Sequence, residues 1–455
     1  MVNDLLPDRN EKDRGYDIGV QIDALGRIPV RKGIIMAISI GSFFSLYEIT
    51  NFNYISPILS SEWDLTDAQI AYAISMRVLG QVVGAFCISI IADWKGRRPA
   101  LMITLIILAV GTILVSVSTS IFQVSVFRLL TGIGIGAELV IATAYIGEIS
   151  PRSMRGRYIS IIFLIGTIGL ASSGPISLFL LQEEEIMGID SWRILMAIPA
   201  AVAILLLQLR FNMRESPRWL LSKGRIRETN ITLVKLGLRP IQEKEIDSAS
   251  AITQKNALHT LKNRKIFSRM LLFVGIWFLI LVPTAASALL VVEYVNQGYT
   301  TIQSVEITTI GSVGYVLGAC LSIVMADRFE RKYQFAIVSA VMAISFIIRG
   351  LIVHDYIVLA AASFVGFAAN SWLTACLFTY TAENFPTRIR SIASGGAEGL
   401  GSGFSAIGPI IFVLLQPFGF FYIMVGLATF LFVAAIAVVS FGRRSVGISL
   451  EQLND

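Results

Sequence analysis

The sequence has few charged residues, few cysteines and few histidines. Only 15% of its 455 residues are Asp, Glu, Lys or Arg, whereas soluble domains contain about 25%. A soluble chain of this length would form about two or three domains, and this one has too little polar surface to cover them. Three cysteines and two histidines are too few for a disulfide framework or a metal cluster. We therefore expect neither a soluble multidomain protein nor a metal or other cofactor.

Long apolar runs make up most of the chain instead. Hydrophobic residues account for 55% of it, and about 20 apolar residues cross a bilayer as a helix. The runs are continuous rather than alternating, which favours helices over a β-barrel. Twelve candidates are found at 34–59, 68–92, 99–118, 121–146, 158–181, 194–211, 267–295, 304–326, 333–352, 355–382, 392–415 and 419–441. The sequence predicts an all-α membrane protein with twelve transmembrane helices.

Lys and Arg are distributed unequally among the connecting loops. The loops after the second, fourth, eighth and tenth runs are basic, whereas 60–67 and 182–190 are acidic. Because cytoplasmic loops carry the excess of Lys and Arg, we expect both termini in the cytoplasm and a multi-pass protein of the cell membrane. Residues 1–23 lack the apolar core of a signal peptide, so none is expected. The basic residues are divided among short loops, which argues against nucleic-acid binding.

Two short patterns recur about 235 residues apart. Segments 145–155 and 380–390 share Tyr, Glu, Pro and Arg at identical spacing, and Asp93 falls opposite Asp327. Two independent matches at one offset indicate a duplicated chain with two pseudo-symmetric six-helix halves. Duplicated halves imply a site near the midplane at their interface, opened alternately to either side.

A long polar segment separates the two halves. The predicted divisions are a cytoplasmic N-terminal segment 1–32, a first six-helix bundle 33–211, a cytoplasmic linker with short helices 212–266, a second bundle 267–441 and a cytoplasmic tail 442–455.

Several loop motifs resemble those of the major facilitator superfamily. They are Gly80, Gly84, Ser89, Asp93, Gly96, Arg97 and Arg98 between the second and third runs, "RLLTGIGIG" (128–136) leading into "YIGEISPRSMRGR" (145–157), "ESPRWLLSKGR" (215–225) and "AENFPTRIRS" (382–391). They look most like the sugar-porter and metabolite:proton symporter branches. The resemblance implies the fold of that superfamily and ion pairs that bridge helices when the cytoplasmic side is closed. The alternative is ordinary solvated loop charge. The gate residues implied are Asp93, Arg97, Glu148, Arg155, Asp327, Glu383 and Arg390.

A carboxylate, Glu48, lies in the middle of the first run, where a lone charge costs at least ~2.5–3.5 kcal/mol. With a rise of ~1.5 Å per residue, Glu48 lies roughly 16 Å below the outer surface and Arg128 roughly 12 Å, with Arg77 at a similar depth. The resemblance agrees, because proton-coupled sugar porters pair an acid in span one with the Arg that opens the span-four glycine motif. Glu48 and Arg128 match those positions, although Glu replaces Asp and Leu46 replaces Gly.

We therefore predict proton coupling at Glu48 and Arg128, with a static ionic brace as the alternative. Glu138, in the fourth run, is either a second protonation site or a partner of cytoplasmic arginines.

Arg77 would suit a carboxylate or phosphate by bidentate hydrogen bonding. The alternatives are that it shares Glu48 or extends toward the outer acidic loop. The sugar porters' paired glutamines in spans five and seven are missing, so we favour a small organic anion or another polar metabolite over a hexose. Other candidates for the cavity are Tyr47, Asn51, Tyr54, Ser172, Thr284, Ser287, Glu293, Tyr294, Asn370, Trp372 and Tyr380.

The sequence thus predicts a secondary active transporter of a small polar metabolite, either an organic anion or a sugar-like solute, coupled to protons. The alternative is a facilitative uniporter or exchanger without proton coupling. No nucleophile with a neighbouring base, nucleotide loop or metal spacing supports an enzyme. We expect a monomer whose partners are its solute, protons and the lipid bilayer.

Overall fold

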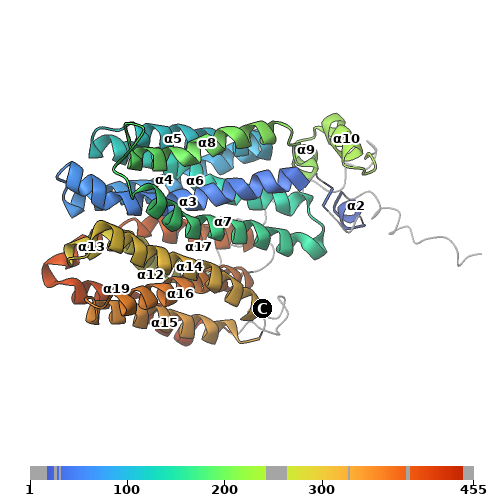
Figure 1. The fold of residues 1–455 in the computed structure, drawn as a ribbon. Helices are drawn as coiled ribbons and strands as arrows, with labels where there is room; N and C mark the ends of the chain where they lie inside the picture. The colour runs from blue at the N-terminus through green and yellow to red at the C-terminus, as the bar shows by residue number, and fades with distance from the viewer. Residues whose placement is uncertain are drawn as a thin grey trace, which may run out of the picture.

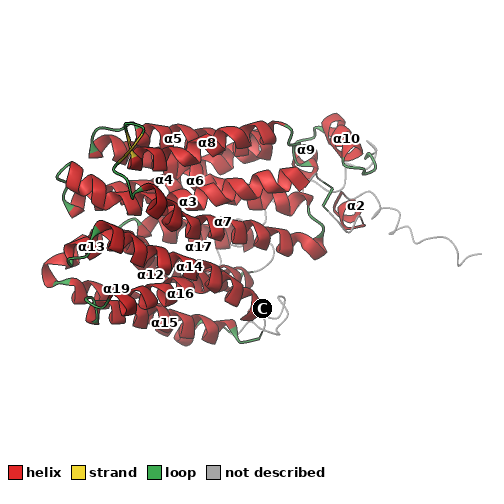
Figure 2. Ribbon diagram, viewed as in Figure 1, coloured by secondary structure: helices red, strands yellow, loops and turns green. Residues whose placement is uncertain are grey.

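Twelve helices in the described part of the computed structural model are long and apolar enough to cross a membrane. The structure describes residues 18–24, 28–29, 32–241, 264–325, 328–385 and 390–443. Within these ranges nearly the whole chain is helical and the connections are short, as Figure 2 shows. The predicted all-α fold with twelve spans is confirmed.

The first half consists of six long helices, drawn blue to green in Figure 1. They are α3 (Lys32–Glu62), α4 (Asp67–Lys95), α5 (Arg97–Ser116), α6 (Ile121–Ile149), α7 (Arg152–Leu180) and α8 (Ser191–Phe211). A two-residue hairpin, β1 (Glu185–Ile186) with β2 (Ile189–Asp190), precedes α8, and the strands are antiparallel.

The second half contains six further spans, two of them interrupted. Its elements are α12 (Arg264–Ala286), η3 (Ser287–Leu289), α13 (Leu290–Asn296), α14 (Thr301–Met325), α15 (Arg331–Leu351), α16 (Tyr356–Glu383), α17 (Arg390–Ser405), α18 (Gly408–Leu415), η4 (Gln416–Phe418) and α19 (Phe420–Phe441). The seventh span joins α12, η3 and α13, and the eleventh joins α17, α18 and η4.

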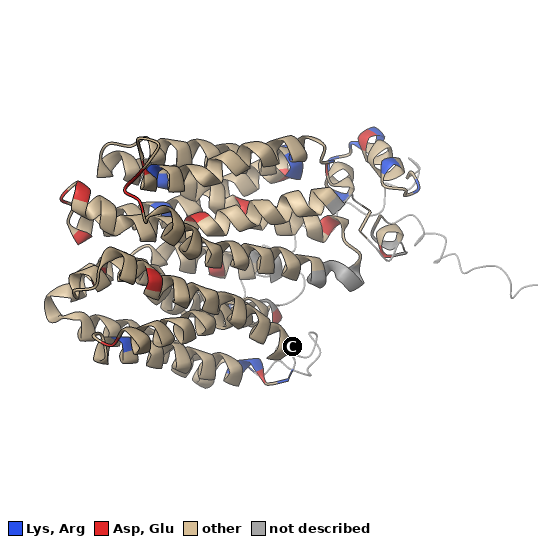
Figure 3. Ribbon diagram, in the orientation of Figure 1, with Lys and Arg blue, Asp and Glu red and all other residues tan. Residues whose placement is uncertain are grey.

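Three short helices lie beyond one end of the bundle (Figure 1). They are α2 (Ile18–Ala24), α9 (Pro217–Ser222) and α10 (Ile226–Lys235). Ile18 and Ile22 of α2 form a small apolar cluster with Leu233 of α10 and with residues that follow it. We call the end of the bundle that carries these helices the inner end and the opposite one the outer end. Figure 3 shows that charged residues gather toward these two ends, with a few between them.

Glycines bring pairs of helices into backbone contact in both halves. A Cβ added at Gly80 or Gly84 of α4 would overlap backbone carbonyls of α6, and one added at Gly314 or Gly318 of α14 would overlap carbonyls of α16. These two glycine pairs are 234 residues apart in the sequence, close to the offset of the loop motifs. Small residues at helix interfaces permit such close approach. The same packing is therefore found at equivalent places in the two halves.

Candidate functional site

Glu48 of α3 and Arg128 of α6 meet inside the first half. Both side chains are fully buried, and Arg128 Nη1 lies 3.5 Å from Glu48 Oε1. Arg128 also donates from Nε to the carbonyl of Ala73 at 3.2 Å, and its guanidinium carbon lies 3.9 Å from the ring centre of Phe52. The structure thus brings together the two residues that the sequence paired, while their role in proton coupling stays a prediction.

This pair has an unusual number of unused hydrogen-bonding atoms. Both carboxylate oxygens of Glu48 and both terminal nitrogens of Arg128 have no hydrogen-bond partner within the described residues. A buried donor or acceptor without a partner carries a free-energy penalty. Arg128 is held by Ala73 and Phe52, but no hydrogen bond joins it to Glu48, so a small helix movement can separate the two groups.

Arg77 of α4 lies at the same level. Its side chain is buried, Nη1 donates to Gln81 Oε1 at 3.1 Å, and Nε has no partner in the described part of the chain. Arg77 interacts electrostatically with Glu48. The Glu48 carboxylate therefore lies near two guanidiniums, those of Arg77 and Arg128. The sequence predicted a similar depth for all three side chains.

Glu138 of α6 forms a second buried pair, with Arg210 of α8. Arg210 Nη1 donates to Glu138 Oε2 at 3.0 Å, and Nη2 donates to Oε1. The hydroxyl of Thr104 donates to the same carboxylate at 2.5 Å, and Arg210 also donates to the carbonyl of Leu101 at 2.7 Å. Unlike the Glu48 pair, this one is bidentate and hydrogen-bonded on both sides.

Arg210 was not among the residues expected from the sequence. It lies in the last turn of α8, at the inner end of an apolar run, where an arginine ordinarily extends to water. A comparison of every charged residue inside the twelve runs would have revealed it. Glu138 was expected to be either a second protonation site or a partner of cytoplasmic arginines. The structure places Arg210, an arginine near the inner end, beside it. Whether Glu138 also titrates during function stays a prediction.

Several polar candidates of the second half lie close to one another. Thr284 of α12 donates to Asn370 of α16 at 3.3 Å. The hydroxyl of Tyr294 in α13 lies 3.5 Å from that of Ser363 in α16. The indole nitrogen of Trp372, also in α16, is buried without a hydrogen-bond partner among the described residues.

In the first half, the candidates Tyr47, Asn51 and Tyr54 are buried. The amide nitrogen of Asn51 donates to the carbonyl of Leu195 in α8 at 3.0 Å. The hydroxyl of Tyr47 is buried without a partner in the described ranges. Tyr54 packs in an apolar cluster with Val291 of α13, so it lies where the halves meet.

Three other candidates use their hydroxyls within their own half. Ser172 donates to the carbonyl of Ile168, and Ser287 donates to that of Pro283. Tyr380 donates to the carbonyl of Arg443 at 2.8 Å. The structure does not gather these three with the residues described above.

The two halves are joined by polar contacts near the outer end. Gln416 of η4 donates to Asp67 of α4 at 2.6 Å and to Glu293 of α13 at 3.2 Å. Asn296 of α13 also donates to Asp67, at 3.1 Å. Together, Asp67, Glu293, Asn296 and Gln416 form what we call the outer latch. It connects the start of the second span with the ends of the seventh and eleventh spans.

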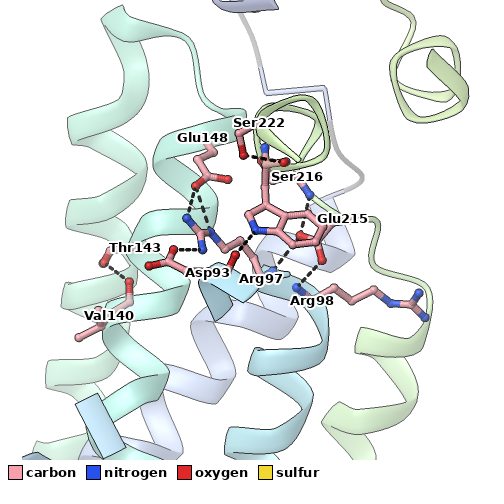
Figure 4. Close-up of polar contacts among 10 residues, drawn as sticks. Asp93, Arg97, Arg98, Val140, Thr143, Glu148, Glu215, Ser216 and Ser222 are labelled. Atoms are coloured by element: carbon pink, nitrogen blue, oxygen red, sulfur yellow. Dashed lines mark hydrogen bonds and ion pairs between the residues drawn. The ribbon is translucent and has the colours of Figure 1, made fainter. Parts of the chain in front are cut away.

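At the inner end, ion pairs form within each half, and Figure 4 shows those of the first half. Arg97 lies 2.6 Å from Asp93 and 3.0 Å from Glu148. In the second half Glu383 pairs with Arg331 at 2.6 Å, an arginine not assigned to the gate from the sequence. The other three predicted gate positions cannot be placed, because Asp327 lies outside the described residues and the side chains of Arg155 and Arg390 are not described.

Glu215 extends this inner-end network to the segment before α9. Its carboxylate accepts from the backbone N–H groups of Arg97 at 2.9 Å and Arg98 at 3.1 Å, which cap the start of α5 (Figure 4). Burial raises the pKa of Glu215, although these N–H groups act in the opposite direction. Trp219 of α9 donates from its indole to the carbonyl of Asp93 at 3.0 Å. The "ESPRW" motif is therefore tied to the loop between spans two and three.

Two charged residues of the second half were not considered from the sequence. Glu398 lies partly buried in α17 without a hydrogen bond or ion pair in the described part of the chain. Arg349 lies near the outer end of α15 and is 1% exposed. Both are charges inside apolar runs, the same signal that identified Glu48.

Twelve spans, two halves with matching glycine contacts, and buried ionisable side chains between helices together define a multi-pass membrane transporter with the major facilitator fold. The sugar (and other) transporter family matches residues 33–455, and the chain belongs to that family. The resemblance found in the sequence is thereby confirmed, and the family is one of transporters rather than enzymes.

Known relatives are similar over nearly their whole length. The niacin transporter NiaP of Acinetobacter baylyi is 23% identical, and the match covers 95% of this chain and 99% of that protein. The benzoate transport protein of the same organism is 23% identical, with 88% and 86% covered. Among solved structures, a D-xylose-proton symporter superposes with a TM-score of 0.71 at 19% identity, covering 92% of this chain and 99% of the other.

Proposed function

We propose that this transporter moves a small organic anion across the cell membrane by alternating access and couples that movement to protons. The observation that carries the proposal is the fully buried Glu48–Arg128 pair, whose carboxylate oxygens and terminal nitrogens form no hydrogen bonds in the described part of the chain. An ionisable group inside a membrane span is costly and is in general functional.

The arrangement of Glu48 suits a group that gains and loses a proton. Burial favours its neutral form, and a neighbouring guanidinium favours its charged form. Since Arg128 is not fixed to it by hydrogen bonds, movement of α3 relative to α6 changes the balance between these two effects. The Glu138–Arg210 pair is held instead by two hydrogen bonds from the guanidinium to the carboxylate.

The balance of buried charge supports an anionic solute. Among the described residues the buried arginines are Arg77, Arg128, Arg210 and Arg349, and the buried acids are Glu48, Glu138 and Glu293. Four cations against three acids leave an excess of positive charge inside the bundle. Niacin and benzoate, the solutes named for two relatives, both carry a carboxyl group.

The proposal also includes the orientation in the membrane, the oligomeric state, the domain divisions and the residues that contact the solute. We place both termini in the cytoplasm, so that the inner end faces the cytoplasm, and we propose that the chain acts as a monomer. We also propose the predicted divisions at residues 32, 211, 266 and 441. The outer latch then closes the extracellular side, and the candidate residues between the halves face the cytoplasm or an enclosed space. The candidates for solute contact remain Arg77, Tyr47, Asn51, Tyr54, Ser172, Thr284, Ser287, Tyr294, Asn370 and Trp372.

Uptake by purified protein in liposomes tests the coupling. We expect accumulation of radiolabelled niacin or benzoate to require an inwardly directed proton gradient. Glu48→Gln should abolish this gradient-driven accumulation and retain exchange of solute between the two sides. The matched control is Glu306→Gln, because Glu306 lies at the outer end of α14 and accepts only from Tyr356 in the described structure. Accumulation by Glu48→Gln at the wild-type level would refute proton coupling and favour a uniporter or exchanger.

A further inference from the structure

Arg349 extends into the bundle although water is close to its backbone. It lies two residues before the outer end of α15, yet its side chain is 1% exposed. Long cationic side chains near a helix end ordinarily extend toward water. Arg349 instead runs back along α15, where Nη2 lies 3.4 Å from Ser345 Oγ. Its charged group therefore lies about one turn deeper than its Cα.

The guanidinium of Arg349 is poorly satisfied where it lies. Nε and Nη1 have no acceptor, and no ion pair with an acid is found, among the described residues. Its guanidinium carbon lies 4.7 Å from the ring centre of Phe346 and 5.6 Å from that of Phe367. Aromatic rings attract a cation, but they do not accept the in-plane hydrogen bonds of a guanidinium. Two donors remain available for an acceptor.

A glycine of α16 leaves space for the guanidinium of Arg349. A Cβ at Gly366 of α16 would overlap Arg349 Nη2. The next residue, Phe367, stacks on Tyr315 of α14 with ring centres 4.9 Å apart. The guanidinium is thus bordered by aromatic rings on α14, α15 and α16, and its contact with α16 requires a glycine.

The two halves differ in the charged residues at equivalent positions. At the offset of 235 residues, Ser363 takes the place of Arg128 and Pro283 takes the place of Glu48. The second half therefore lacks both members of the buried pair. Arg349 supplies a cation from a neighbouring span, one turn of α16 away from Ser363. The first half provides a carboxylate beside its buried arginine, whereas no acid of the described second half forms an ion pair with Arg349.

Helix α13 covers this group. Tyr294 of α13 interacts electrostatically with Arg349, and its hydroxyl lies 3.5 Å from that of Ser363. The neighbouring residue Glu293 belongs to the outer latch, where it accepts from Gln416. The same short helix therefore closes the outer end of the interface and lies over Arg349.

We propose that Arg349 binds the carboxylate of an aromatic monocarboxylic acid, which reaches it when Tyr294 of α13 moves away from α16. Nε and Nη1 of the guanidinium offer donors to the carboxylate, and the edges of the stacked rings of Phe367 and Tyr315 can contact the aromatic part. This inference rests on the proposed function, because it names the class of anion that is transported.

Equilibrium binding tests the inference without a proton gradient. Benzoate and niacin are each compared with their neutral amides, benzamide and nicotinamide, by titration calorimetry on detergent-solubilised protein. The wild type should bind each acid more tightly than its amide. In Arg349→Gln the affinity for the acids should fall by about tenfold or more, as loss of a charge-assisted hydrogen bond predicts. The affinity for the amides should not change, and Arg349→Lys should lie between wild type and Arg349→Gln.

The control variant is Arg225→Gln, because Arg225 lies in the inner segment and pairs with Glu228. A thermal unfolding curve of each variant shows whether it is folded. If Arg349→Gln unfolds too readily for calorimetry, Gly366→Ala serves as a second variant, since its Cβ would displace the guanidinium, and the acids should again lose affinity selectively. Three results would overturn the inference: no preference of the wild type for acids, an equal loss for acids and amides, or full competition of benzoate by chloride alone. Each of these leaves the test of Glu48 unaffected.

Discussion

The two buried ion pairs of the first half should differ in strength, and the difference can be measured. In Glu138–Arg210 the carboxylate accepts two hydrogen bonds from the guanidinium. In Glu48–Arg128 the groups are 3.5 Å apart without a hydrogen bond. Double-mutant cycles, with Glu→Gln and Arg→Gln at each pair, isolate the interaction of the two side chains.

The expected difference follows from the geometry. Two unit charges 3.5 Å apart attract by about 5 kcal/mol at an effective dielectric constant of about 20, and the second pair has a similar Coulomb attraction. Each hydrogen bond to a charged group adds about 1.5–3 kcal/mol. The coupling energy of Glu138–Arg210 should therefore exceed that of Glu48–Arg128 by about 3 kcal/mol or more.

The assay is unfolding of the purified protein and its variants in one detergent, followed by helix content as denaturant is added. Within each cycle the single variants are compared with the double variant, so that effects of each substitution alone cancel. A coupling energy for Glu48–Arg128 equal to or above that of Glu138–Arg210 would refute the view that the former pair is held loosely. It would also remove the main physical support for its role as a movable proton carrier.

Three further predictions concern other parts of the molecule. The double variant Gln416→Leu/Asn296→Leu removes both amides that donate to Asp67 across the halves, so spin labels at the outer ends of α4 and α13 should report longer distances than in the wild type; unchanged distances would show that the latch does not hold the halves. Burial raises the pKa of Glu215, so its proton is held more tightly in the folded state. The stabilisation of the folded state that follows from this raised pKa is complete below the ordinary glutamate pKa. It is lost as pH rises through the raised pKa of Glu215. Unfolding curves across this range should show that Glu215→Gln lacks that part of the pH dependence, and an unaltered profile would count against it. Gly136→Leu should destabilise the protein strongly, because a Cβ there would overlap the carbonyl of Gln81, and a melting temperature like that of the wild type would contradict the backbone contact.

The spans could be predicted closely from hydropathy, but their interruptions could not. The run 267–295 contains Pro283, and the structure continues it as a helix to Ala286 before a short 3-10 turn leads into α13. The run 392–415 is likewise divided between α17 and α18. Hydropathy averages over a window and is insensitive to a single turn of altered backbone. These interruptions matter because α13 and η4 carry the outer latch.

Charged residues in the middle of a run were recognised more readily than those near its ends. Glu48 and Arg128 lie far from water along their helices, so their cost is evident from the sequence. Arg210 and Arg349 lie within two residues of a helix end, where an arginine is expected to extend outward. Both extend inward instead. The direction of a side chain depends on its neighbours in other spans, which the sequence does not specify. For the same reason, the sequence did not identify Arg331 as the partner of Glu383.

The glycine contacts between α4 and α6, and between α14 and α16, limit where the protein can bend. Helices whose backbones touch have little freedom to slide without steric overlap, so each pair acts as a rigid body. Relative motion is then left to the other helix contacts, among them the seams between the halves, where the hydroxyl of Ser75 donates to Ala406 and that of Ser312 donates to Ala171. A transport cycle breaks hydrogen bonds of this kind between the halves. Each glycine-packed helix pair then moves as one unit, so a movement at one face of the membrane is transmitted to the other face.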